Sequence, residues 1–442
     1  MSNILRTLFR AWNKFWFDRQ PTYSLGIFRI VFGLFLLITF LISYPNWERF
    51  YGPQGYLPFS ALGEPWAGYL WSILSLTDKE WFLWVIFWFA VIASAAFIIG
   101  LKTRVATIFL FVIFISMLHR NPFLINGQDQ VAAMLLFFSI FAPLGASFSV
   151  DEFWRRFHHF QRSKEQFVAE RKSMWALRLM QVSIALVYIF SGPAKYFDDI
   201  TWRDGSAIYY VSLSDRWFRF PDITLFHSEP ISMVLTFGTL LVEIAFPLFV
   251  WFSRTRSFVL IGITLFHYGM MIFMSSAVFF FNLMMLISFI LFIPSAAMER
   301  LLHFLPRRTA EIFYDGQCGL CVRTMNFLKA LDGGGRLQFF NFRNPSIHKK
   351  FPQLNLQELE KEMYLRTEGG EMRKGFFAYQ YLAKVLPSLY FIVPLFYLPA
   401  SNFLGPKIYN FVAEHRFQLF PCTTCGTSHA GVCEVKPSNV SD

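Results

Sequence analysis

Eight long apolar runs constrain the fold of this chain more than any other feature. A helix needs about twenty mainly apolar residues to cross the hydrocarbon core of a bilayer, and each run approaches that length. The shortest runs, 104–119 and 130–147, end in polar turns. The runs predict an α-helical polytopic membrane bundle. They cover residues 24–44, 81–100, 104–119, 130–147, 174–192, 231–252, 257–275 and 277–297.

The composition supports a membrane location. Of the 442 residues, 55% are hydrophobic and 57 are phenylalanine, which exceeds the apolar content of an average soluble protein. The excess apolar surface must therefore face lipid. We expect the bilayer to be the main partner of residues 21–300.

Basic residues predict how the bundle is oriented. Cytoplasmic loops of membrane proteins are enriched in Lys and Arg, and alternate connections of this chain carry such clusters. Both termini are therefore predicted to be cytoplasmic, and the loop 193–230 to lie outside. The net charge of +11 reflects this topology and not nucleic-acid binding. The clusters are Arg6, Arg10, Lys14 and Arg19; Lys102 and Arg104; Arg155, Arg156, Arg162, Lys164, Arg171 and Lys172; Arg254 and Arg256; Arg300, Arg307 and Arg308.

The first twenty residues carry no visible cleavable signal peptide. The segment "LRTLFRAWNKFWFDR" alternates basic and bulky apolar residues. This pattern predicts an amphipathic helix over 1–20 that lies on the cytoplasmic membrane surface.

The pattern changes after Arg308. The segment "AEIFYDGQCGLCVRTMNFLKALDGGGRLQFFNFR" predicts strand, turn, helix, glycine turn and strand, and "EMYLRTEGGEMRKG" predicts a hairpin around Gly369 and Gly370. We expect a cytoplasmic α/β domain over 309–420. The run "LYFIVPLFYL" is short and broken by proline, so we expect it either to pack on this domain or to lie on the membrane.

All five cysteines follow residue 317. Cys318 and Cys321 stand where a strand turns into a helix, and amides at a helix N-terminus stabilise a thiolate. The spacing favours a redox pair over a metal site or an idle pair. We predict that Cys318, the better exposed thiol, attacks and that Cys321 resolves.

The local sequence "YDGQCGLC" resembles the DCC thiol–disulfide oxidoreductase family. The likeness rests on Asp315, Cys318 and Cys321 and covers 309–420, including "IYNFVAEHRFQLF". It implies a thioredoxin-like fold and a thiol-redox activity.

The tail, 421–442, contains three more cysteines and one histidine. Cys422, Cys425, His429 and Cys433 suit a single tetrahedral zinc site. They also fit idle thiols in a tail, or a pair that resolves Cys318. The sequence leaves these three interpretations open.

Ionisable residues inside membrane helices are costly, so each is a functional candidate. Glu243 lies near the middle of its run, and Pro247 cannot donate to the Glu243 carbonyl. His267 lies at similar depth in the next run. The two predict either one polar pocket or one hydrogen bond between helices. Arg29 lies near the cytoplasmic end of the first run, where it is able to snorkel.

Lys195 follows a Gly192–Pro193 break that we expect to end the fifth helix and to turn the chain back. The loop through Trp202 and Gly205 is expected to hold it. On position alone Lys195 is either an interface anchor or a catalytic base. Asn126 and Asp129, in "LINGQDQ", are predicted to lie on the same outer side. Asp198 and Asp199 are expected to face water or to hold the loop.

The order of several motifs is similar to that in the HTTM family, which groups vitamin K-dependent γ-glutamyl carboxylase with bacterial relatives. The likeness covers about 20–300, and its most specific piece is the G-x-x-K…W-x-x-G stretch. The motifs are "LGIFRIVFGLFLL", "IIGLKTR", "LINGQDQ", "APLGASFSVDEFW", "SGPAKYFDDITWRDGSA" and "TLFHYGMM".

This resemblance implies a role for Lys195 as the active-site base. A reduced quinone of the menaquinone or vitamin K type would lose a proton to it and react with oxygen, and a substrate carbanion would capture carbon dioxide. Residues assigned to the cofactor site are Asn126, Asp129, Glu243, His267 and Trp202. Arg203, Arg216 and Arg219 would bind an acidic substrate, or are solvated loop charges. The implied location is the cytoplasmic membrane of a bacterium.

The chain departs from the carboxylase pattern in two respects. Ile125-Asn126-Gly127 replaces Asn-Asn-His, so the asparagine carries over and the histidine does not. A thiol domain stands in place of the large extracytoplasmic domain that binds propeptide and substrate in the carboxylase. The likeness therefore supports quinone handling better than glutamate carboxylation.

Three functions stay open on the sequence. The first is a membrane enzyme that couples oxidation of a reduced quinone to carboxylation of an acidic peptide or small substrate. The second is an oxidoreductase that links thiols to quinones without carboxylation. The third is a non-enzymatic partner in maturation of, or immunity to, a secreted peptide toxin.

Overall fold

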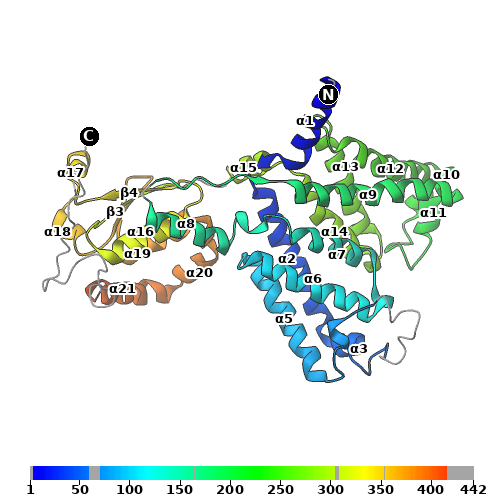
Figure 1. Cartoon of the computed structure of the whole chain (residues 1–442), viewed down its shortest axis with the longest axis horizontal. Coiled ribbons are helices and arrows are strands. Elements are labelled where there is room, and N and C mark those ends of the chain that lie inside the picture. Colours follow the sequence, from blue (N-terminus) through cyan, green and yellow to red (C-terminus); the bar gives the residue numbers. More distant parts are fainter. Residues whose placement is uncertain (1–2, 59–69, 164, 304–307, 353, 416–442) are drawn as a thin grey trace. The chain divides into compact units, whose positions relative to one another are not determined.

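The computed structural model describes residues 3–58, 70–163, 165–303, 308–352 and 354–415 (Figure 1). The chain divides into two compact units. Unit 1 comprises residues up to 151 together with 169–299. Unit 2 comprises residues 152–168 together with 300 onward. Each is described by itself.

Unit 1 is a bundle of long apolar helices. Among its described residues, six helices are long and apolar enough to span a membrane, and a further pair, Ser276–Phe292 and Ser295–Leu301, qualifies together but bends by 100°. The predicted multi-pass helical membrane protein is confirmed. The six helices are α2 (Tyr23–Ser43, continuing in shorter helical turns to Tyr51), α5 (Glu80–Ile99), α6 (Thr103–Arg120), α9 (Trp175–Asp198), α12 (Glu229–Phe249) and α13 (Arg256–Phe273).

Helix α7 (Gly127–Ser139) departs from the predicted span 130–147. Its 13 residues extend about 20 Å, less than the roughly 30 Å of a hydrocarbon core. It packs against α6, α9 and α14 (Phe279–Phe289), and it buries Ala132, Leu135 and Leu136 completely. The apolar run therefore forms a short core helix followed by a turn.

Arg29 does not snorkel. Its guanidinium is fully buried and donates hydrogen bonds to the carbonyl oxygens of Leu144 (2.8 Å), Ser147 (3.2 Å) and Phe148 (2.5 Å). Gly100, with φ +71°, leaves room for it, since a Cβ there would lie 2.6 Å from Arg29 Nη1. Arg29 thus ties the turn after α7 to α2.

The predicted helix break at Gly192–Pro193 is wrong. Helix α9 continues through both residues to Asp198. Proline lacks only its own N–H, so the loss is limited to the hydrogen bond that the Ile189 carbonyl would accept, plus a local steric cost. Lys195 therefore stands in the last turns of α9 and not in a returning loop.

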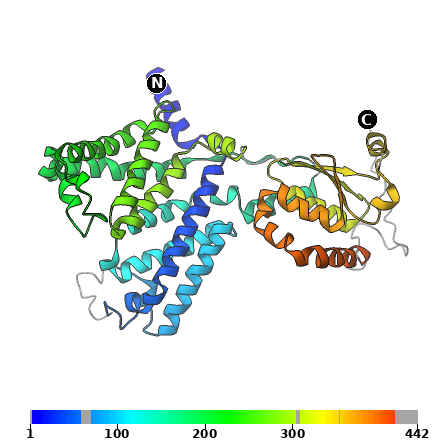
Figure 2. The same cartoon turned by 180° about the vertical axis from the view of Figure 1, so that it is seen from behind.

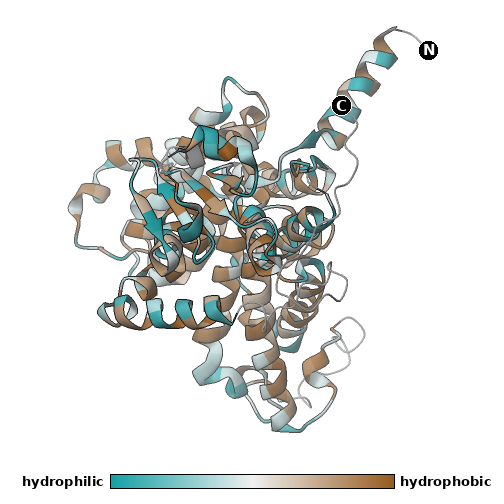
Figure 3. Ribbon diagram, turned by 90° about the vertical axis from the view of Figure 1, so that its left-hand side faces the viewer, coloured by the Kyte–Doolittle hydropathy of each residue, from teal (hydrophilic) through white to brown (hydrophobic). Residues whose placement is uncertain are grey.

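The first residues of the chain form helix α1 (Asn3–Phe17). Hydrophilic and hydrophobic residues alternate around it, beside the N label in Figure 3. Ile4, Leu8 and Trp12 are exposed, as an interfacial helix requires. Strand β1 (Arg19–Gln20) then pairs antiparallel with β2 (Lys172–Ser173).

Unit 2 contains a four-stranded sheet in the order β4–β3–β5–β6 (Figure 2). Strands β3 and β4 are parallel, and the other pairs are antiparallel. Helix α16 connects the parallel pair, as a crossover must, and the predicted hairpin at Gly370 joins β5 and β6. The elements are β3 (Ala310–Tyr314), α16 (Gly319–Leu331), β4 (Leu337–Asn341), α17 (Pro345–Lys350), α18 (Leu356–Leu359), β5 (Tyr364–Thr367), β6 (Met372–Lys374) and α19 (Gly375–Val385).

Alternate residues of β3 enter two separate cores. Ile312 packs with Met325 of α16 and Leu382 of α19, whereas Phe313 packs with Phe351 and Leu359. This two-sided burial explains the continuous apolar strand. The arrangement is the predicted thioredoxin-like one.

Residues 152–168 pack with unit 2, which the sequence did not indicate. Arg156, on α8 (Val150–Arg162), donates from Nη2 to the carbonyl oxygen of Asp332 (2.7 Å). The rings of Phe153 and Phe327 lie 5.1 Å apart. The loop between the predicted fourth and fifth spans is thus part of the C-terminal unit.

Candidate functional site

Polar side chains follow one face of α9. Tyr188, Ser191 and Lys195 stand at positions i, i+3 and i+7, a spacing that aligns side chains on one side of a helix. Lys195 and Ser191 interact with α12, and Tyr188 interacts with α13. The row therefore brings groups from three helices together inside the bundle.

Lys195 forms an ion pair with Glu243. Its ammonium contacts Oε1 of the carboxylate, and Oε2 accepts a hydrogen bond from the Ser191 hydroxyl (3.0 Å). The Lys195 side chain is 30% exposed and that of Glu243 only 5%. The Lys195 ammonium also lies 5.3 Å from the Trp202 ring centroid. The lysine is accessible, while the carboxylate is held inside.

His267 belongs to a second polar chain. Its Nε2 lies 2.6 Å from the Tyr188 hydroxyl and its Nδ1 2.6 Å from Oδ1 of Asn282. Asn282 uses its amide nitrogen to donate to the Val278 carbonyl (2.8 Å), so Oδ1 acts as an acceptor. A neutral imidazole then carries its proton on Nδ1 and accepts from Tyr188 at Nε2.

The predicted membrane-site residues are only partly brought together. Glu243 and His267 face the same helix but bind different partners. Asn126 and Asp129 instead form a capping box at the start of α7. Asn126 is exposed, its backbone amide donates to Asp129 Oδ2, and its side-chain amide donates to the Leu124 carbonyl.

The loop residues after α9 lie at the surface. Arg203 and Arg216 are exposed, as is Arg219. Asp198 and Asp199 are also exposed, and Asp199 accepts from the Thr201 amide at the start of α10 (Ile200–Asp204). The expectation that these two aspartates face water or hold the loop is confirmed.

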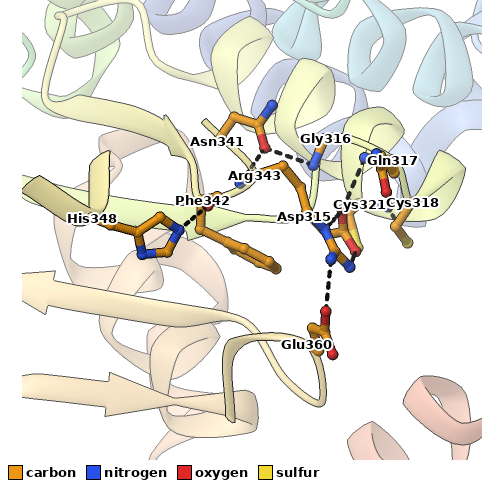
Figure 4. Close-up of polar contacts among 10 residues, drawn as sticks. All are labelled: Asp315, Gly316, Gln317, Cys318, Cys321, Asn341, Phe342, Arg343, His348 and Glu360. Carbon is orange, nitrogen blue, oxygen red and sulfur yellow. Dashed lines mark hydrogen bonds and ion pairs between the residues drawn. The ribbon is translucent and has the colours of Figure 1, made fainter. Parts of the chain in front are cut away.

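The two cysteines stand at the N-terminus of α16 (Figure 4). Cys318 is the residue before the first helical position, and its Sγ accepts from the Cys321 amide (3.3 Å). A thiolate is stabilised at such a position by the amides and the helix dipole. The predicted strand–turn–helix placement is confirmed.

The turn before Cys318 is fixed from the neighbouring parallel strand. Arg343, just after β4, binds Asp315 through Nε (3.1 Å) and Nη2 (2.9 Å), and Nη1 donates to Glu360 (2.6 Å). These hydrogen bonds to Asp315 are the main reason that the pKa of Arg343 is raised above its usual value. Asn341 Oδ1 also accepts from the Gly316 amide (3.1 Å; Figure 4).

A cavity of about 440 Å³ adjoins Cys321. Cys321 and Thr324 enter it from α16, and α21 (Pro399–Glu414) forms part of its wall. Burial is the main cause that raises the pKa of Tyr379 well above its ordinary value, so its hydroxyl stays protonated. The lining is mainly aromatic and aliphatic, and it contains the carboxylates of Asp315 and Glu362 but no Lys or Arg among the described residues. Its aromatic members are Phe313, Tyr314, Phe376, Tyr379, Phe396 and Tyr409.

The expectation that Cys318 is the better exposed cysteine is wrong. Cys318 is only 2% exposed, whereas Cys321 is half-buried and lines the cavity. The role of Cys318 as the attacking thiolate stays a prediction, and it now depends on the position of Cys318 at the helix N-terminus and not on its exposure. The four tail residues Cys422, Cys425, His429 and Cys433 lie outside the described residues. Within the described part of the chain, no group of three or more His, Cys, Asp or Glu could hold a metal ion.

Sequence reasoning missed several partners in both sites. Tyr188 and Ser191 were identifiable from their helical spacing to Lys195. Arg343 follows the strand that pairs in parallel with the strand before Cys318, so its closeness depends on the sheet order. Asn282 is buried, and it is the only polar residue in the run "FFFNLMM". A single amide within an apolar run was the signal that could have identified it.

A helical membrane unit with a buried ion pair, joined to a thioredoxin-like dithiol unit, defines a membrane protein with a thiol-redox domain. The chain belongs to the HTTM domain family, which it matches over residues 17–296. Residues 312–422 match the DCC1-like thiol-disulfide oxidoreductases. No curated protein and no solved structure matches the chain.

Proposed function

We propose that unit 1 is an enzyme site that removes a proton from a reduced quinone, and that Lys195 is the acceptor. The observation that carries this proposal is the pairing of an accessible amine with a buried carboxylate, Glu243, inside a bundle of the HTTM family. An interface anchor needs no buried acidic partner. Such a partner is expected where a proton must be held and transferred.

Glu243 gives the lysine a way to become neutral. A Lys195 ammonium and a Glu243 carboxylate carry no net charge together, and transfer of the shared proton to Glu243 leaves two neutral groups. Charges are costly to keep in an apolar interior. Lys195 then has a free electron pair for an incoming phenolic proton, and the pair becomes singly positive. The proton that is taken up belongs to the pair and not to one residue.

The residues present fit a planar apolar ring near Lys195. The Trp202 ring faces the ammonium, and the amine is the exposed member of the ion pair. When bound, a reduced quinone would supply the electrons that oxygen consumes. Lys195 would hold the proton, and Trp202 would help to orient the ring.

The carboxylation step depends on an acidic substrate. Arg203 and Arg216 are exposed in the loop that follows α9, where they would attract a carboxylate. We assign to this step an acidic peptide or small molecule, by analogy with the vitamin K-dependent carboxylase. The proposed location is the cytoplasmic membrane of a bacterium with both termini inside.

The packing of α8 supports this topology. Residues 152–168, which include most of α8, belong to the same unit as the thiol domain, so the connection between α7 and α9 and the C-terminal domain would share one side of the membrane. The cation clusters of that connection and of residues 300–308 predict the same side.

The test compares Lys195→Arg and Lys195→Ala with Lys79→Arg, a control that keeps an exposed cation near another helix end. Purified chain in nanodiscs receives vitamin K hydroquinone, and oxygen consumption and fixation of labelled carbon dioxide are measured. Arginine keeps its proton in proteins, so both Lys195 variants should lose oxygen consumption while the control retains it. Full activity in Lys195→Arg would make the lysine an anchor.

The cavity beside Cys321 favours a second candidate function, dithiol–quinone oxidoreduction. An apolar, aromatic-lined cavity without cations suits an uncharged ring better than an anionic thiol such as glutathione. The two S–H bonds of Cys318 and Cys321 would break, one S–S bond would form, and two electrons and two protons would convert a quinone into its quinol.

Duroquinone tests this candidate because its ring has no free position for thiol addition. Reduced protein should lose two thiols for each duroquinol formed, and Ala413→Trp, which fills the cavity from α21, should prevent this. Asn410→Trp, on the exposed side of the same helix, is the matched control. Equal rates in the two variants would remove the cavity from the reaction.

A further inference from the structure

The last described part of unit 2 exposes an unusual number of large apolar side chains. They come from the turns η9 (Pro387–Ile392) and α20 (Val393–Phe396), and from Leu398 and α21. Phe391 is 80% exposed. We call this surface the apolar face. Its members are Phe391, Leu395, Leu398, Phe403, Leu404, Ile408 and Phe411.

Helix α21 has two apolar sides with different roles. Gly405, Tyr409 and Val412 line the cavity inside unit 2. Leu404, Ile408 and Phe411 follow one another at i, i+4 and i+7 and are each more than half exposed, so they form a stripe along the helix. Ile408 also borders the cavity. Leu404 and Phe411 are not among the residues that line the cavity.

Polar residues border the exposed stripe. Lys407, Asn410 and Glu414 are also exposed and are spaced i, i+3 and i+7. The Lys407 ammonium lies 3.8 Å from the Phe403 ring centroid, so the cation stands beside an exposed aromatic ring of the apolar face. An apolar stripe with a polar border is the pattern of a helix lying in a membrane interface.

The segment that carries the apolar face also contains few charged residues. Residues 387–414 contain only two charged residues, Lys407 and Glu414. An exposed apolar area of this kind marks a membrane or a protein partner. With a single acid, at the last residue of α21, the segment meets little repulsion from an anionic lipid surface.

The segment lies on a membrane more readily than it spans one. Helix α19 and the turns η9–α20 together pass the hydropathy and length test for a span, but they bend by 117°. Ala378, Leu382 and Val385 of α19 are buried in the core beneath the sheet. The most exposed large apolar side chains of this pair, Phe391 and Leu395, follow Pro387.

We propose that the apolar face docks unit 2 on the lipid bilayer. The same chain carries at least six membrane-length helices, so unit 2 is tethered to a membrane and the local concentration of lipid is high. Residues 416–442 contain Phe417, Leu419 and Phe420 as alternative occupants of the face, and the shortened chain in the test distinguishes them from lipid. Docking places α21 between lipid and the cavity beside Cys321.

Depth-dependent fluorescence quenching tests the docking. In the full chain the five native cysteines are replaced by serine, and a single cysteine is placed at Leu404 or at Glu368, an exposed residue of the β5–β6 turn. Each is labelled with an NBD dye and reconstituted, one copy per nanodisc, in phosphatidylcholine and phosphatidylglycerol with or without nitroxide-bearing lipid. We expect blue-shifted emission and nitroxide quenching at position 404 and neither at position 368.

A charged variant and a shortened chain separate the possible occupants. Leu395→Glu with Phe411→Glu should abolish quenching at position 404 and leave position 368 unchanged. Quenching at 404 no greater than at 368 would overturn the proposal. Blue-shifted emission at position 404 without quenching would also overturn it if the blue shift disappears in a chain that ends at residue 415. Residues 416–442 would then be what covers the face. Shielding that requires two copies per nanodisc would instead identify a second chain as the occupant.

Discussion

The reactive groups of the two units stand at opposite ends of their helices. Cys318 begins α16, where free amides and the positive end of the helix dipole favour a thiolate. Lys195 lies near the end of α9, where free carbonyls stabilise a cation. The thiol site is therefore arranged for its reactive ionic form. The lysine site depends on a partner, Glu243, to take up the proton that would keep the amine inactive.

The units also differ in how their charged groups are protected. Asp315, Arg343 and Glu360 form a network that is partly open to water. Glu243 is nearly inaccessible and is paired with a single lysine. Removal of one partner is consequently expected to cost more in unit 1 than in unit 2.

The largest expected effect is the separation of two activities. Lys195→Arg should lower quinol-dependent oxygen consumption by about 10²–10⁴-fold, the usual contribution of a general base, while the dithiol still reduces 5,5′-dithiobis(2-nitrobenzoate). Cys318→Ser with Cys321→Ser should do the reverse.

The two assays are run on the same nanodisc preparations with Lys79→Arg as control. Loss of both activities in either variant would contradict the comparison, because it would mean that the two units work as one catalytic centre.

The next effect concerns the ion pair itself. Glu243→Leu leaves the Lys195 ammonium without its buried partner and should destabilise the protein by about 1–3 kcal/mol. Adding Lys195→Met should restore much of this loss, since replacing both members of a buried pair is often close to neutral.

Thermal unfolding in detergent, followed by circular dichroism, measures this double-mutant cycle. Additive losses in the double variant would show that the pair does not interact in solution, and the proton-sharing role of Glu243 would fail with it.

The sequence located the members of this pair but not their pairing. Glu243 was recognisable as a carboxylate in mid-run, and Lys195 as a cation at a helix end. Their contact depends on α9 continuing through Pro193, and local sequence rules predicted a break there. Tertiary packing against α12 overrides that local preference, which a single sequence does not reveal.

The thiol unit was more predictable because its signals are local. The hairpin glycines, the strand before Asp315 and the helix after Cys318 lie within short stretches and were predicted correctly. The cavity forms between α21 and the helices α16 and α19, which are distant from α21 in the sequence. Neither the cavity nor the exposure of Cys321 could therefore be predicted from local sequence signals. The length of α7 was predicted wrongly. The capping signal of Asn126 and Asp129 at its start was visible, but the predicted span continued past Ser139, where the helix ends.

A smaller effect separates the two cysteines. Cys321 borders the cavity and Cys318 is almost inaccessible, so N-ethylmaleimide, which is small and uncharged, should modify Cys321 first. Mass spectrometry after brief labelling of reduced protein gives the order.

Ala413→Trp should slow labelling of Cys321, whereas Asn410→Trp should not. Faster modification of Cys318 would show that its thiolate character outweighs burial, in keeping with the role as attacking thiolate that its helix position predicts.

The smallest expected effect is loss of the clamp on the turn before Cys318. Arg343→Leu removes two hydrogen bonds to Asp315 and one to Glu360, but Arg343 is about one-third exposed, so solvent already screens the pair. We expect the turn to be destabilised by about 1 kcal/mol, which hydrogen exchange would detect as faster exchange of the Gly316 and Gln317 amides. Arg343→Lys should give an intermediate exchange rate, because lysine cannot bind both carboxylate oxygens through a planar fork. The hydrogen bonds to Asp315 raise the pKa of Arg343, so its guanidinium stays charged and the clamp should not weaken as the pH rises from neutral. Unchanged exchange in Arg343→Leu would mean that the Asn341–Gly316 hydrogen bond alone fixes the turn, and the thiol site would then need no charged network at all.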